Sequence, residues 1–79
     1  MSDGRRVADD ERAVWAEVRE MDRSGVYDRI RVAEAARRAG VPEPRARQFA
    51  RTWANDGLVS LAGTANKVRL TDEGRAADL

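Results

Sequence analysis

Large apolar side chains are scarce in this chain. Of its 79 residues, 33 are apolar, but 14 of these are Ala, which leaves 19 larger apolar side chains. A chain this short with so few large groups forms a thin core and is marginally stable without a cross-link. The sequence has no Cys and no His, so disulfides, thiolate metal sites and most zinc sites are excluded. We expect one small domain without a metal or cofactor.

The same absences bear on function. Without His or Cys, the chain lacks the usual general bases and the most reactive nucleophile. It also has no Gly-rich phosphate loop and no Ser in an activating context, so we do not expect an enzyme. No apolar run approaches the roughly 18 residues that cross a bilayer, and no signal peptide opens the chain. We therefore expect a cytoplasmic protein that does not contact a membrane.

Charge is distributed unevenly along the chain. The net charge is +1, but residues 1–28 carry −3, residues 29–51 carry +5 and residues 52–79 carry −1. A local basic patch attracts polyanions even when the net charge is near zero. The middle of the chain is therefore the first place to look for a nucleic-acid site.

Residues 9–23 follow a helical pattern. Val14, Trp15, Val18 and Met21 recur at three- and four-residue spacing, which places them on one face that we expect to be buried. We expect Asp9 or Asp10 to cap this helix and Gly25 to end it. These neighbouring acids point in different directions on a helix, so a capping role is favoured over a metal cluster. Residues 1–8 are expected to form a flexible arm, and residues 9–79 the domain.

The basic middle of the chain predicts a short strand and two helices. Tyr27 is expected to be a half-buried strand residue, and a brief strand is expected near residues 29–31. Residues 32–39 form a short Ala-rich helix that Gly40 ends. Residues 43–56 form a longer helix whose buried stripe contains Ala46, Phe49, Ala50 and Trp53. At about 100° per residue, the opposite face presents Pro44, Arg47, Gln48, Arg51 and Asn55, flanked by Arg45 and Thr52.

The last third predicts a hairpin and a short helix. Residues 58–61 and 67–70 are strand candidates, and the small residues 62–66 form the loop between them. Thr71 can cap a final helix that runs to about Ala77. The predicted fold is α+β and mainly helical, with a helix-turn-helix followed by a two- to three-stranded wing. In full, it is a winged helix-turn-helix: a three-helix core, a β-wing and a short C-terminal helix.

Three segments of the chain form a recognisable series. They read V-A-E-A-A-R-R-A-G-V at 32–41, W-A-N-D-G-L-V at 53–59 and V-R-L-T-D-E-G-R at 68–75. In order and spacing they resemble the winged helix-turn-helix regulators of bacteria and archaea, of the MarR and GntR types. The resemblance covers about residues 9–75 and implies a small transcriptional regulator that binds DNA. The chain departs from the family pattern at Pro42, where Ser or Thr is common. It also has Ala36 and Ala46 where larger residues are usual, and Trp53 is expected to fill some of that space.

The exposed side chains of helix 43–56 suit duplex DNA. Arg pairs with guanine and with phosphates, whereas Gln and Asn pair with adenine. The N-terminal half of a recognition helix lies deepest in the major groove. We therefore expect Arg45, Arg47 and Gln48 to contact bases, and Arg51 to contact bases or phosphate. The full set of expected DNA contacts is Arg37, Arg38, Arg45, Arg47, Gln48, Arg51, Thr52, Asn55, Lys67 and Arg69, with the 62–67 wing on the backbone or in the minor groove.

A second function fits the same fold. Winged helices also act as protein-docking modules, and the acidic first third could dock a basic partner protein through helix 9–23. The basic face of helix 43–56 favours DNA. The chain could also form a homodimer through helix 9–23 and the C-terminal tail, because paired modules read two half-sites.

Overall fold

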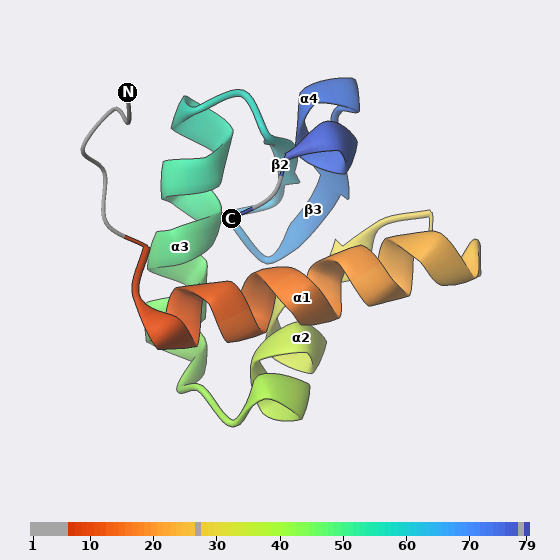
Figure 1. Cartoon of the computed structure of the whole chain (residues 1–79). Helices are drawn as coiled ribbons and strands as arrows, with labels where there is room; N and C mark the ends of the chain where they lie inside the picture. Colours follow the sequence, from red (N-terminus) through yellow and green to blue (C-terminus); the bar gives the residue numbers. More distant parts are fainter. Residues whose placement is uncertain (1–6, 27, 78) are drawn as a thin grey trace.

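The computed structural model describes residues 7–26, 28–77 and 79. Its elements in chain order are α1 (Asp9–Ser24), β1 (Ile30–Arg31), α2 (Val32–Ala39), α3 (Glu43–Asn55), β2 (Val59–Ala62), β3 (Lys67–Leu70) and α4 (Asp72–Ala76) (Figure 1). Three main helices precede a three-stranded antiparallel sheet and a short C-terminal helix, which confirms the predicted α+β winged-helix topology. Most of the expected arm at residues 1–8 lies outside the described residues, as does Tyr27.

Helix α1 buries the predicted face. Val14, Trp15, Val18 and Met21 are all at most 3% exposed. Gly25 ends the helix in the left-handed conformation, with φ of 74°, as expected. The predicted cap is wrong, because Ala8 holds the N-cap position and no side chain caps the helix. Asp10 lies inside the first turn, where its carboxylate accepts a hydrogen bond from the Glu11 N–H and also pairs with Arg45.

Helices α2 and α3 form the predicted helix-turn-helix. Gly40 ends α2 with φ of 72°, and the Val41 N–H then donates to the Ala36 carbonyl, 3.0 Å away. This pattern turns the chain sharply into α3. Pro42 occupies the N-cap position of α3 without a side-chain hydrogen bond, as its ring requires. Its carbonyl instead accepts the N–H groups of Arg45 and Ala46, each at 3.1 Å.

The sheet has the order β1-β3-β2, and both pairs are antiparallel. Strand β3 matches its predicted range, but β2 begins one residue later than predicted. Leu58 is used by the preceding turn, because its N–H donates to the Trp53 carbonyl and its own carbonyl accepts the Thr71 N–H. Ala62, predicted in the loop, pairs with Lys67, so the hairpin loop spans residues 63–66.

The core lies where the helices meet the inner face of the sheet. Trp15 and Trp53 pack edge to face there, with ring centroids 4.8 Å apart, and both are buried. Trp53 therefore lies in the core, as its place on the predicted buried stripe of this helix indicated. The Trp53 Nε1–H donates to the Glu11 carboxylate at 2.8 Å, which satisfies a polar group that would be costly to bury alone.

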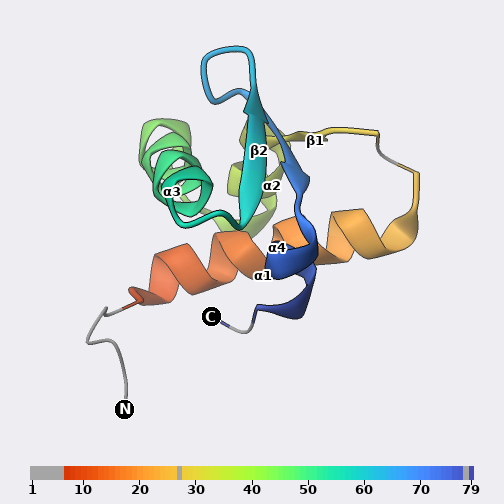
Figure 2. The same cartoon turned by 90° about the horizontal axis from the view of Figure 1, so that it is seen from above.

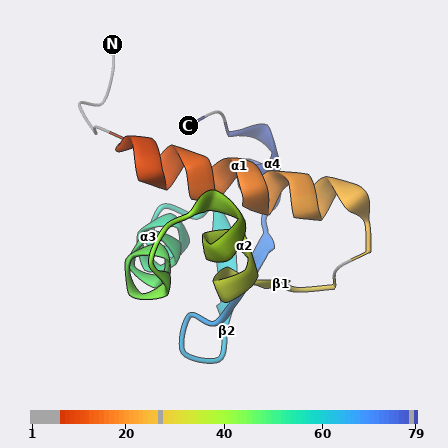
Figure 3. The same ribbon diagram turned by 90° about the horizontal axis from the view of Figure 1, so that it is seen from below.

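Helix α1 and the hairpin loop lie on opposite sides of the molecule (Figure 2). Viewed from above, α1 crosses one side, whereas the loop between β2 and β3 extends on the other, beside α3 (Figure 2). The view from below shows the same arrangement, with α2 in front of the sheet (Figure 3). The hairpin loop therefore lies beside α3 on the side that faces away from α1.

Candidate nucleic-acid interface

The outward side of α3 matches the predicted helical face. Gln48, Arg51 and Asn55 are exposed, and the Arg47 side chain is 33% exposed. Ala46, Ala50 and Trp53 on the opposite side are buried in the core. Among the described residues, Arg51 has no ion pair and the side-chain amides of Gln48 and Asn55 have no hydrogen bond. We call Arg47, Gln48, Arg51 and Asn55 the outer face of α3.

Arg47 connects this face to the hairpin loop. Its guanidinium donates to the side-chain oxygen of Asn66 at 3.3 Å and lies 3.5 Å from the Glu43 carboxylate, one turn earlier on α3. The Asn66 carbonyl accepts the Val32 N–H at 2.9 Å, which anchors the loop to the start of α2. The loop residue Ala65 is buried and adopts φ of 65°, so the loop packs against the body of the protein. This arrangement holds Arg47 and the loop in a fixed relation.

Arg45, which was expected to contact bases, faces α1 instead. Its guanidinium pairs with Asp10 and lies over the Phe49 ring, 5.0 Å from the centroid. The hydrogen bond from Arg45 lowers the pKa of Asp10, and the same contact raises the pKa of Arg45. The side chain is still about half exposed. The contact with a base that was expected of Arg45 would therefore require it to give up a carboxylate partner.

Thr52 also turns back towards its own helix. Its hydroxyl donates to the Gln48 carbonyl at 3.2 Å, and the residue is half-buried. Such back-bonding satisfies the hydroxyl within the helix. Arg45 and Thr52 were expected to flank the outer face, but neither side chain points in the same direction as that face.

Arg37 and Arg38, at the end of α2, share one acid. Both guanidiniums bond to Glu34, which lies one turn earlier, with 3.2 Å between Arg38 Nε and the carboxylate. Partial burial raises the pKa of Glu34, but the hydrogen bonds from Arg38 and Arg37 outweigh it and leave the pKa below its ordinary value. Exposed pairs of this kind are weak, so both arginines stay accessible to a phosphate.

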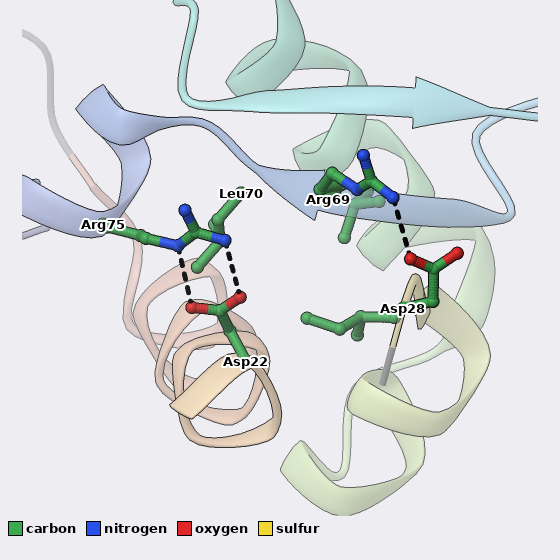
Figure 4. Close-up of a pocket in the computed structure, with 7 residues that line it drawn as sticks. Asp22, Asp28, Arg69, Leu70 and Arg75 are labelled. Carbon is green, nitrogen blue, oxygen red and sulfur yellow. Dashed lines mark hydrogen bonds and ion pairs between the residues drawn. The ribbon is translucent and has the colours of Figure 1, made fainter. Parts of the chain in front are cut away.

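The two predicted wing cations, Lys67 and Arg69, both lie on β3 but have different surroundings. Lys67 is exposed at the start of β3, next to the hairpin loop. Arg69 donates to the Asp28 carboxylate at 2.8 Å and lines a pocket of about 380 Å³. Arg75 and Asp22 form a second ion pair in the same pocket (Figure 4). No α3 residue lines this pocket.

Sequence reasoning missed three residues that contact or lie opposite the expected DNA-binding side chains. Asn66 contacts Arg47, Asp10 holds Arg45, and Arg31 lies directly opposite Lys67 in the sheet. The basic strand prediction at 29–31 contained a signal for Arg31. No sequence signal gave the strand register or the approach of α1 to α3.

The described part of the chain contains neither a cluster of metal-binding side chains nor a membrane-spanning helix. Its His, Cys, Asp and Glu side chains form no group of three or more that could hold a metal ion, the acids at the start of α1 included. Within the same residues, no helix has both the length and the apolar character to span a membrane. Comparison with protein-family models, with curated proteins and with solved structures gave no match.

Proposed function

We propose that this protein binds double-stranded DNA as a small transcriptional regulator of the winged helix-turn-helix type. In this proposal α3 enters the major groove with its outer face, and the hairpin loop lies on the backbone or in the minor groove. The proposal extends the resemblance seen in the sequence to the helix-turn-helix regulators. It assigns no catalytic step to the chain.

The outer face of α3 is the observation that most supports this function. Arg47, Gln48 and Arg51 provide donors that can bond to base edges and phosphates. Arg47 and Gln48 lie in the N-terminal half of α3, which a recognition helix places deepest in the groove, and Arg51 lies one turn further along. Among the described residues, Glu43 is the one acid paired with this face, and it lies at its edge. An exposed helix with these side chains has the shape and chemistry of a major-groove reader.

The test is the salt-dependent affinity of the chain for a labelled duplex, measured by fluorescence anisotropy. Replacing Arg47 and Arg51 together by Ala should cost about 1–3 kcal/mol for each contact made to a base, and should flatten the salt dependence. The control is the Arg12→Ala, Arg23→Ala double variant, which has the same net charge but changes α1. Equal affinities and salt slopes for the two double variants would contradict the proposal.

A protein-docking function is the alternative, and the ion pairs favour it to a degree. Arg45 and Arg69, both expected to contact DNA, are held by carboxylates that lie 35 and 41 residues away in the sequence. A docking module would need no free cations on α3. The absence of any duplex binding at low salt would favour this function over DNA binding.

A further inference from the structure

We propose that Arg31 and Lys67 form a second phosphate-binding site, which receives the DNA backbone beside the groove occupied by α3. We call these two residues the sheet patch. This inference rests on the proposed function and extends the interface to β1, a strand outside the helix-turn-helix and the hairpin.

The sheet patch juxtaposes two cations. Arg31 of β1 and Lys67 of β3 are directly paired in the antiparallel register, and both are exposed. Side chains at such paired positions lie within about 5 Å of each other at Cβ, so like charges there repel. A phosphate placed between them would remove that repulsion. The free protein therefore contains a local electrostatic conflict that an anion can relieve.

Most other basic side chains already have partners. Within residues 7–26, 28–77 and 79, the cations that form neither an ion pair nor a hydrogen bond are Arg29, Arg31, Arg51 and Lys67. Glu34 lines a shallow pocket together with Arg31, but its carboxylate is held by Arg37 and Arg38. The sheet patch thus keeps its full positive charge available to a ligand.

The patch adjoins the outer face of α3. Lys67 follows Asn66, and Arg31 precedes Val32, whose N–H donates to the Asn66 carbonyl at 2.9 Å. The Asn66 side chain in turn accepts a hydrogen bond from Arg47. One loop residue therefore separates the sheet patch from the proposed recognition helix. Because the hairpin loop lies beside α3 on the side away from α1 (Figure 2), a duplex docked on α3 brings its backbone towards the patch.

The experiment compares single variants by their DNA affinity across about 50–200 mM salt. Each phosphate contact contributes about 0.9 to the slope of log affinity against log salt, so Arg31→Ala and Lys67→Ala should each reduce the slope by about one. The control is Arg23→Ala, an equal loss of charge on α1, which should leave the slope within about 0.3 of the wild-type value.

Lys67→Glu separates binding from folding. It would place a carboxylate opposite Arg31, so the free protein should melt at the same or a higher temperature while its affinity for DNA falls further than in Lys67→Ala. A lower melting temperature for Lys67→Glu would contradict the conflict inferred between the two cations.

The outcomes distinguish this inference from the proposed function. Unchanged slopes for Arg31→Ala and Lys67→Ala, with affinity lost in the Arg47 and Arg51 variants, would overturn the sheet patch and leave the recognition helix intact. If the wild-type chain binds no duplex but its patch binds an acidic peptide, both proposals are overturned in favour of protein docking.

Discussion

Arg45 and Arg51 lie fewer than two turns apart on α3, but their side chains have different surroundings. Arg51 is exposed and without an ion pair among the described residues, whereas Arg45 is bonded to Asp10 and covers the Phe49 ring. Asp10 would thus compete with any approaching phosphate for the Arg45 guanidinium. In the proposed DNA complex, this one carboxylate on α1 would limit how much positive charge α3 offers to the duplex.

Replacing Asp10 by Asn should strengthen DNA binding. The change releases Arg45, and because an exposed ion pair of this kind is weak, the affinity should rise by only about two- to fivefold. The salt slope should steepen by about one if Arg45 then reaches a phosphate. Asp9→Asn is the matched control, since Asp9 is fully exposed and lies 3.8 Å from Arg12. An equal gain in both variants would show only a general charge effect.

The ion pair between Asp10 and Arg45 forms in the pH range in which the Asp10 carboxyl is ionised. Because Arg45 lowers the pKa of Asp10 below its ordinary value of 3.8, the pair is fully formed above that value. Its contribution to stability is lost only as the pH falls through the lowered pKa. The competition is therefore constant at neutral pH.

The solvent exposure of side chains could be predicted from the sequence more readily than their ion-pair partners. The 100° periodicity correctly placed Gln48, Arg51 and Asn55 outside and Trp53 inside. The same periodicity could not show that Arg45 meets Asp10, because those residues are 35 positions apart and meet through the crossing of α1 and α3. Sequence spacing describes one helix, whereas ion pairs between elements depend on how the elements pack.

At the scale of elements, α4 and its cap Thr71 pack against the turn that follows α3. The Thr71 hydroxyl donates to the Gly57 carbonyl at 2.6 Å and accepts the Gly74 N–H at 3.0 Å, which confirms the predicted cap. Gly74 is buried against the Leu58 backbone, and a Cβ added there would lie 2.0 Å from the Leu58 carbonyl oxygen. The placement of Thr71 and Gly74 in the segment V-R-L-T-D-E-G-R at 68–75 therefore has a packing reason in this chain.

Gly74→Ala should destabilise the protein. The obstructing atom is backbone, so it cannot move aside without shifting the turn before β2, and overpacking of this kind costs about 1–3 kcal/mol. Thermal unfolding should begin at least about 4 °C lower for a domain of this size. Glu73→Ala, an exposed position on the same helix, should change the melting temperature little. A melting temperature for Gly74→Ala equal to that of Glu73→Ala would contradict the close approach.

Element boundaries were predictable where local chemistry decides them. Gly25 and Gly40 ended their helices as expected, because the left-handed conformation they adopt suits Gly. The start of α1 was not predictable in the same way, since Asp10 uses its carboxylate for Arg45 and the adjacent N–H rather than for a cap. The start of β2 moved by one residue because Leu58 completes the bonds of the preceding turn.

At the scale of the whole molecule, the uneven charge of the sequence acquires a direction. The segment 29–51, with its charge of +5, contains β1, α2 and the first nine residues of α3. The outer face of α3 and the sheet patch adjoin one another through Asn66, whereas α1 lies on the side away from the hairpin loop (Figures 2 and 3). A net charge of +1 thus conceals a basic side that can orient the protein on a polyanion.

An NMR titration of the isotope-labelled chain with duplex DNA would map this side without any mutation. We expect the backbone amide signals of the first turns of α3, of loop 63–66 and of β1 to shift on addition of DNA. Signals from α1 residues 12–23, on the other side of the molecule, should keep their positions. Shifts confined to α1 and the C-terminal residues, or no shifts at low salt, would contradict DNA binding through α3.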